Sequence, residues 1–353
     1  MVKFVNYYIQ KTRIRMRFVS ITIAVLAMAF LSGPAAGAQN DPDDSGRKAF
    51  REALKLYEHS MLSSSRKAFG SFGEESVSSD PEGFEVLTQV RAAVPGYEAV
   101  MNSFLERNPH SILVPQVRWY HAMNLFDCQS YDLAGDVLEQ IDVKDLLKGQ
   151  RTQYLFTKAY CDLEARDLES AESNFKSVEK EAFSDYTAPS RYALGYINYV
   201  NRDFKTAIDW FEKARKDSRF VQMSDYYIME SHFMLGDHEF VTANGDRMYE
   251  AVPEERRPHL ARIISESWLV LGDADNARRY LDLNAQGGDQ VKSRADWFFS
   301  GSVLYAVEDY KGAVDAYAMM GEKRDSIGQV ALYHMGFSYI QTKNKVAAMK
   351  SFK

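Results

Sequence analysis

The feature that most constrains this chain is an internal repeat of about 35 residues that occurs nine times. One copy is plainest at residues 192–214, where small and aromatic residues recur at helical spacing: Tyr192, Gly195, Tyr196, Tyr199, Phe204, Ala207, Phe211 and Ala214. The same pattern of small and aromatic residues recurs around Gly301 and around Gly336. Self-similarity at a fixed period of this length predicts stacked helical units, here of two short helices each.

Most copies have a small residue on the first helix, a second small residue twelve positions later on the second helix, and a large apolar residue four positions after that. Small residues let two helices approach closely, and neighbouring hairpins supply the core that no hairpin has alone. The first-helix residues, which we number as position 8, are Ala53, Thr88, Ala122, Ala159, Gly195, Met229, Ser265, Gly301 and Gly336. Their second-helix partners are Ser65, Val100, Ala134, Ala171, Ala207, Val241, Ala277, Ala313 and Ala348.

Turn residues support this register. Gly236-Asp237 and Gly272-Asp273 place a glycine after the first helix and an aspartate where it can cap the second. The sixth copy departs from the pattern, because Gly245 stands where the large residue belongs. We therefore expect its second helix, over residues 237–250, to be the weakest of the array.

The first 38 residues have a different composition. An acid-free lead, with basic residues at Lys3, Lys11, Arg13, Arg15 and Arg17, precedes an apolar run from Phe18 to Leu31. Ala36-Gly37-Ala38 then gives the small-x-small pattern that signal peptidase cleaves. This predicts a secretory signal peptide over residues 1–38, a mature chain that begins at Gln39, a short acidic linker over 39–46 and the repeat array over 47–353. An uncleaved anchor helix is the alternative.

Charge and cysteine content narrow the classes of partner. Cleavage would leave 38 of the 43 basic residues against 49 acidic ones, a formal charge of −11. Such a balance argues against nucleic acid or anionic lipid as the main partner. No cysteine lies directly after the apolar run, which excludes a lipoprotein anchor. The only cysteines of the sequence are Cys128 and Cys161. In an oxidising compartment they form either a disulfide or two buried thiols.

Signatures of catalysis are missing from the sequence. It has no glycine-rich phosphate loop, no nucleophile elbow and no paired-cysteine metal motif. His232 and His238 are six residues apart, which is poor spacing for metal ligands on one helix. We expect a protein that is not an enzyme, with no cofactor and no metal.

The spacing of Gly or Ala, aromatic and Ala residues over residues 47–353 resembles the tetratricopeptide repeat (TPR) family. The resemblance implies an all-α, right-handed superhelical solenoid of about nine helix–turn–helix units, with a concave groove that holds peptides or partner proteins. The Leu-Gly-Tyr-x-x-Tyr motif at Leu194 and the leader peptide are similar to those of exported TPR proteins of Gram-negative bacteria. This implies a periplasmic or outer-membrane-associated location.

In this family, positions 2, 5, 9, 12 and 13 of each first helix face the groove. Position 5 is aromatic in seven of the nine copies, although aromatic residues make up 13% of the chain. The expected groove comprises Trp119, Phe126, Phe156, Tyr160, Tyr192, Tyr196, Tyr199, Tyr226, Phe233, Phe298 and Tyr305, with Glu230, Arg262 and Glu266 among them. Aromatic residues are frequent anchors of bound chains. The alternative is that these rings pack against their neighbours in the core.

The function predicted is a non-catalytic scaffold of the periplasm or envelope that binds another protein or peptide in its groove. The alternative is a ligand- or carbohydrate-binding module of an outer-membrane uptake system, and a third possibility is a structural spacer. A sugar site needs a few clustered aromatic residues, whereas a peptide groove needs a stripe across several repeats, as in this sequence.

The ninth copy stops one residue after Phe352, before its second helix is complete. Repeat arrays need a polar capping element at their ends. We therefore expect the sequence to be part of a longer protein with more repeats downstream.

Overall fold

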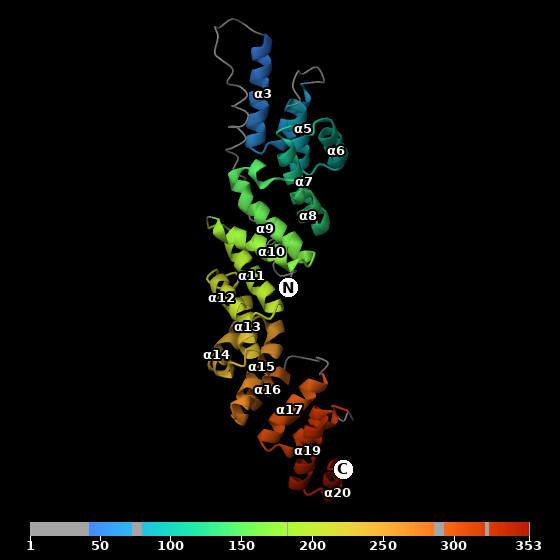
Figure 1. Ribbon diagram of the computed structural model, residues 1–353, viewed down its shortest axis with the longest axis vertical. Helices are drawn as coiled ribbons and strands as arrows, with labels where there is room; N and C mark the ends of the chain where they lie inside the picture. Colours follow the sequence, from blue (N-terminus) through green and yellow to red (C-terminus); the bar gives the residue numbers. More distant parts are fainter. Residues whose placement is uncertain (1–41, 73–79, 182, 286–292, 322–324, 353) are drawn as a thin grey trace. The chain divides into compact units, whose positions relative to one another are not determined.

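The computed structural model describes residues 42–72, 80–181, 183–285, 293–321 and 325–352. These residues form eighteen α-helices, α3 to α20, together with two short 3-10 helices and no β-strand, in successive hairpins (Figure 1). The all-α prediction is confirmed. The predicted signal peptide and its cleavage site lie outside the described residues.

The chain divides into two compact units, one up to Ser190 and one from Arg191. The first unit holds four hairpins. They are α3 (Pro42–Glu58) with α4 (Leu62–Gly70), α5 (Asp80–Arg91) with α6 (Tyr97–Arg107), α7 (Val114–Asp127) with α8 (Tyr131–Glu139), and α9 (Lys148–Glu164) with α10 (Leu168–Lys180). The 3-10 helix η1 (Val143–Asp145) precedes α9. Helix α3 takes in residues 42–46, which the sequence assigned to a linker.

The remaining five hairpins lead into and fill the second unit. They are α11 (Thr187–Val200) with α12 (Phe204–Ala214), α13 (Val221–Met234) with α14 (His238–Ala251), α15 (Arg257–Val270) with α16 (Ala274–Ala285), α17 (Arg294–Ala306) with α18 (Tyr310–Ala318), and α19 (Ser326–Gln341) with α20 (Lys345–Ser351). The 3-10 helix η2 (Glu254–Arg256) leads into α15. The nine predicted hairpins are therefore all present.

Close contact between the two helices of a hairpin explains the small residues at position 8. A Cβ atom added to Gly195 would lie 2.7 Å from Cδ1 of Phe211, and one added to Gly301 would lie 2.6 Å from Cδ1 of Tyr317. Real Cβ atoms do not approach other carbons so closely. The first-helix small residue and the second-helix ring are thus complementary parts of one contact.

Two positions differ from the predicted register. Val100 is 42% exposed, because α6 turns Tyr97, Met101 and Phe104 toward the core instead. Gly245 is buried, and a Cβ there would lie 3.0 Å from Cγ2 of Ile264, so a side chain from the next hairpin occupies the space of the missing ring. The weakness expected of this helix stays a prediction.

The turns between paired helices share a backbone feature that the sequence did not reveal. Each turn contains at least one residue with positive φ, and most of these residues are not glycine. They are Ser60, Ala93, Gly96, Gln129, Arg166, Arg202, Gly236, Gly272, Glu308 and Lys343. The turn between α5 and α6 contains two of them, Ala93 and Gly96. A left-handed residue lets the chain reverse between two helices.

Aspartate caps follow many of these turns, as the sequence predicted for two of them. The Asp237 side chain accepts from the backbone N–H of Phe240 at 3.1 Å, and the Asp273 side chain accepts from that of Asn276 at 2.9 Å. Equivalent caps are made by Asp167, Asp203, Asp309 and Asn344. Each satisfies a donor that the helix cannot satisfy itself. Among the described residues, no helix is both long enough and apolar enough to cross a bilayer.

Candidate protein-binding face

The structure separates the fourteen predicted groove residues into two groups. Six of them are buried and belong to the core: Trp119, Phe126, Phe156, Tyr160, Tyr192 and Tyr226. The Tyr192 ring lies 5.4 Å from that of Phe220 and 6.3 Å from that of Tyr227, both in the following hairpin. At Tyr192, position 5 therefore packs against the next hairpin. The prediction that these six rings are open to a partner was wrong.

The other eight residues are partly exposed, and all of them lie in the second unit. They are Tyr196, Tyr199, Glu230, Phe233, Arg262, Glu266, Phe298 and Tyr305. Helices α11, α13, α15 and α17 carry them, each the first helix of its hairpin. We call this set the first-helix face.

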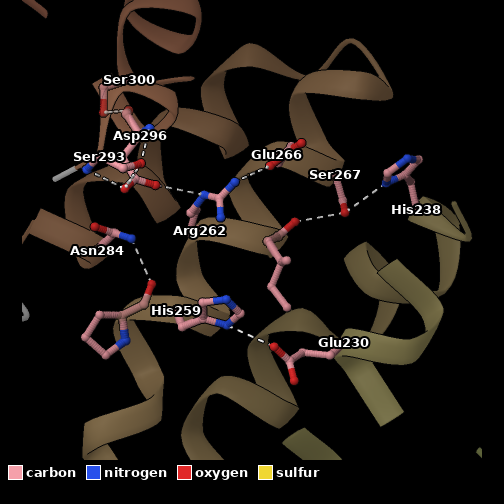
Figure 2. Close-up of polar contacts among 12 residues, drawn as sticks. Glu230, His238, His259, Arg262, Glu266, Ser267, Asn284, Ser293, Asp296 and Ser300 are labelled. Atoms are coloured by element: carbon pink, nitrogen blue, oxygen red, sulfur yellow. Dashed lines mark hydrogen bonds and ion pairs between the residues drawn. The ribbon is translucent and has the colours of Figure 1, made fainter. Parts of the chain in front are cut away.

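A polar network joins α13 to α15 on this face. The hydroxyl of Tyr226 donates to Oε1 of Glu230 at 2.8 Å and lies 3.1 Å from Nδ1 of His259. The same Glu230 oxygen is 3.4 Å from Nδ1 of His259, as Figure 2 shows. The guanidinium of Arg256 lies 5.0 Å from the centre of the Tyr226 ring. Tyr226 is thus a buried anchor that fixes the Glu230 carboxylate, whose side chain is 12% exposed.

A second network joins α15 to α17. Nη2 of Arg262 is 3.4 Å from Oε2 of Glu266 on the same helix, and its Nε is 3.3 Å from Oδ1 of Asp296 on the next first helix (Figure 2). Asp296 is fixed in turn by a capping box, because its Oδ2 accepts from the backbone N–H of Ser293 at 2.9 Å and from its hydroxyl at 2.7 Å. Polar contacts therefore run across three consecutive first helices, and those between α15 and α17 include an ion pair.

Burial sets the protonation of these groups at neutral pH. It lowers the pKa of the His259 imidazole, an effect that the Glu230 carboxylate opposes. Burial and the nearby Glu230 charge raise the pKa of the Tyr226 phenol, and the same two causes raise that of Tyr199. The phenols therefore remain hydrogen-bond donors, and His259 is uncharged. Such neutral groups suit hydrogen bonding to a partner.

The partly exposed rings each have one side packed against a neighbour. Tyr199 lies 5.1 Å from the Tyr227 ring, and Tyr305 stacks on His334 at 4.3 Å with 6° between the planes. A ring held by one face loses little conformational freedom when its other side contacts a partner.

Sequence reasoning missed His259, Arg256 and Asp296. His259 occupies position 2 of its copy, which the family pattern places on the groove side, and so position alone could have found it. The Ser-x-x-Asp pattern at Ser293 is a capping-box signature that marks Asp296 as a fixed carboxylate. Arg256 lies in η2, outside the helical register, and gave no such signal.

Other features of the described residues lie apart from this face. Helices α16, α17 and α18 border an open depression of about 560 Å³, and none of the fourteen predicted residues lines it. Cys128 is exposed and Cys161 is buried, and both are free thiols. Within the described ranges, His, Cys, Asp and Glu side chains nowhere gather in groups of three or more that would suit a metal ion.

Comparison with known proteins finds similar solved structures but no similar sequence family. No family model matches the sequence, and no curated protein matches it either. The apo form of RapI is similar with 10% identity and a TM-score of 0.48, over 87% of this chain and 95% of the other. A tetratricopeptide repeat protein from Parabacteroides merdae has 11% identity and a TM-score of 0.38, over 82% and 99%. Pseudomonas aeruginosa PilF has 14% identity and a TM-score of 0.29, over 75% and 97%.

The assignment of the fold therefore rests on the chain itself. Nine hairpins, a small residue and a second-helix ring in contact within a hairpin, and a left-handed residue at every interhelix turn all recur with the 35-residue period. By these features the protein is an all-α array of TPR-like helical hairpins.

Proposed function

We propose that this protein is a non-catalytic scaffold of the bacterial cell envelope. It is exported to the periplasm and binds a segment of another envelope protein on its first-helix face, and any outer-membrane association is through that partner. The observation that carries this proposal is the row of partly exposed aromatic and charged side chains on α11, α13, α15 and α17.

The length of the row favours a polypeptide as ligand. Packed helices lie about 8–10 Å apart, so four adjacent first helices extend over roughly 25–30 Å. That is the length of about eight extended residues. A single sugar ring would contact only one or two of these helices. A protein segment can use the whole row, with aromatic contacts at its ends and the Glu230 carboxylate and the ion pairs of Arg262 in the middle.

Paired charges on the face also favour recognition over catalysis. Glu230 accepts a hydrogen bond from Tyr226, and Glu266 is paired with Arg262. Asp296 is held by the cap of α17. Preorganised charges orient a partner on the face. They also discriminate against other proteins, because a protein that does not complement these charges leaves them desolvated without a counter-charge. The predicted signal peptide over residues 1–38 supports an envelope location.

Site-specific photo-crosslinking in the source organism tests this proposal. A benzoyl-phenylalanine placed at Tyr199, Glu266 or Tyr305 samples three first helices. We expect all three positions to capture the same protein, in a fraction released with the periplasm. The controls are Asp209, Arg247 and Asp282, which are exposed positions on the second helices of the same region.

Two results would contradict the proposal. Equal capture of that protein from the second-helix positions would remove the first-helix face as the site. Recovery of the protein only in the cell fraction that contains cytoplasmic marker proteins would contradict the envelope location.

A further inference from the structure

Five large apolar side chains are exposed where the first helices of three consecutive hairpins end. Their exposed fractions are 45% for Val200, 50% for Met234, 42% for Leu235, 60% for Val270 and 45% for Leu271. They occupy positions 13 and 14 of the repeat, at the ends of α11, α13 and α15. We call this set the edge ladder.

The repeat itself does not require apolar residues there. In the third and fourth hairpins the same two positions hold Asp127 with Cys128 and Glu164 with Ala165. A hairpin therefore folds with polar or small residues at this edge. Large apolar side chains that recur on the surface of consecutive units, without a packing role, mark an interaction surface.

Contacts between neighbouring hairpins show that the residues of the edge ladder, which we call its rungs, follow one another from hairpin to hairpin. Nδ1 of His238, which follows the turn after Leu235, lies 3.0 Å from the hydroxyl of Ser267 (Figure 2). Ser267 is one helical turn before Val270. The rings of Tyr199 and Tyr227, 5.1 Å apart, join the end of α11 to α13 in the same way. The rungs are thus one hairpin step apart.

Polar side chains at the turns beside the ladder already have partners within the chain. Asp237 accepts from the backbone N–H of Phe240 and lies 2.9 Å from Nδ1 of His232. Asp273 accepts from both the backbone and the side-chain amide of Asn276. An extended peptide needs partners for its own backbone groups. An α-helix satisfies those groups internally and needs only apolar contact.

Carboxylates border the ladder on both sides. Glu230 and Glu266 lie one turn before its rungs on α13 and α15, and Asp203, Asp237 and Asp273 lie in the turns that follow. A partner that buries the apolar rungs would bring its flanking residues against these acids. Lysine or arginine at its flanks complements them, and acidic flanks are repelled.

We propose that the edge ladder is a docking surface for an amphipathic α-helix of a partner protein, with basic residues beside its apolar stripe. Residues i and i+7 of a helix share a face and lie about 10.5 Å apart, close to the spacing of about 8–10 Å between packed helices. Three rungs therefore match an apolar stripe of about fifteen residues. This surface adjoins the first-helix face, because position 13 lies one helical turn after position 9 on the same side of the helix. The inference therefore rests on the proposed function and names the kind of partner segment that this edge of the face takes.

A synthetic helix provides a direct probe. It is a fluorescein-labelled 18-residue peptide of leucine and lysine with its leucines on one helical face. Fluorescence anisotropy should show this peptide binding at least 10-fold more tightly than a scrambled peptide of the same composition, and more tightly than a version with glutamate in place of lysine. The variant Met234→Ser with Val270→Ser should weaken binding at least 10-fold.

Exposed apolar residues elsewhere provide the matched control. Leu133 and Met319 are 57% and 61% exposed, and Leu133→Ser with Met319→Ser should leave peptide binding unchanged. Circular dichroism checks that both double variants remain folded. The variant Phe298→Ala with Tyr305→Ala, on helix α17 that carries no rung of the ladder, should also bind the peptide normally, which separates binding at the ladder from binding along the rest of the first-helix face.

Several outcomes would overturn the inference. Equal binding of the scrambled peptide, or unchanged binding by the ladder variant, would show that the ladder does not recognise a helix. Self-association that the ladder variant abolishes would assign the surface to a second copy of the chain. Binding to phosphatidylglycerol vesicles that the ladder variant abolishes would assign it to a membrane.

Discussion

Gly195 lies so close to the ring of Phe211 that no other residue fits at its position. A Cβ atom there would be 2.7 Å from Cδ1 and 2.8 Å from Cε1 of the ring. Glycine costs a helix up to about 1 kcal/mol of stability relative to alanine. In return the two helices of the hairpin come together, and the Phe211 ring is fully buried.

We predict that Gly195→Ala lowers the free energy of unfolding by about 1–3 kcal/mol, because the added methyl group overpacks the contact with Phe211. The matched control is Gly149→Ala in α9, where a Cβ meets nothing within 4 Å. That substitution should be neutral or stabilise by up to about 1 kcal/mol. Urea denaturation measures both. A Gly195→Ala protein as stable as the control would contradict the close contact.

The residues with positive φ in the interhelix turns give two contrasting predictions, one for a glycine and one for a residue other than glycine. Gly272 has φ of 85°, so Gly272→Ala should destabilise the protein by about 1–2 kcal/mol. Arg202 has φ of 61° without being glycine, and Arg202→Gly should cause no loss of stability, because relief of strain offsets the added flexibility of the unfolded chain. Thermal denaturation compares them. The account fails here if both substitutions destabilise equally.

The Tyr317–His334 contact predicts a pH dependence. The hydroxyl of Tyr317 lies 2.8 Å from Nδ1 of His334, and burial lowers the pKa of that imidazole in the folded state. The unfolded chain therefore takes up the proton first as the pH falls below about 6.5. Stability from this residue is present above that pH and is lost as the pH falls toward the folded-state pKa.

We expect His334→Gln to reduce the loss of stability between pH 7.5 and pH 5.5 in urea titrations. Because burial rather than the hydroxyl causes the shift, Tyr317→Phe should leave most of that loss in place. A His334→Gln protein with the same pH dependence as the wild type would show that the imidazole is not held neutral.

The repeat register was predictable because the residues that set the period are the residues that touch. Gly195 and Phe211 meet within one hairpin, so their spacing in sequence directly encodes a contact. The exposure of Val100 was not predicted because the buried face of α6 begins at Tyr97, directly after Gly96, which has a left-handed conformation. That geometry follows from a turn and has no periodic signal.

The proposed binding face was predictable only in part. Tyr192 and Tyr196 are one helical turn apart on α11, yet Tyr192 is fully buried and Tyr196 is partly exposed. What covers Tyr192 is the next hairpin, through Phe220 and Tyr227. The tilt of one hairpin against the next decides which ring is covered, and the repeat period does not specify it. The charged residues were found because few core positions tolerate them.

Two ion pairs in one hairpin allow the most direct test of the proposed function. Arg262 and Glu266 on α15 lie on the first-helix face, and Arg262 also reaches Asp296 in the next hairpin. Arg278 and Asp282 on α16 have the same spacing, and Arg278 likewise reaches Asp309. Removal of either pair leaves the net charge unchanged.

The measurement is calorimetric titration of the partner captured by photo-crosslinking against the two double variants. We predict that Arg262→Ala with Glu266→Ala weakens binding at least 10-fold, whereas Arg278→Ala with Asp282→Ala binds as the wild type does. Equal affinity of the two variants for the partner, with both folded, would contradict the claim that the first-helix face is the binding site.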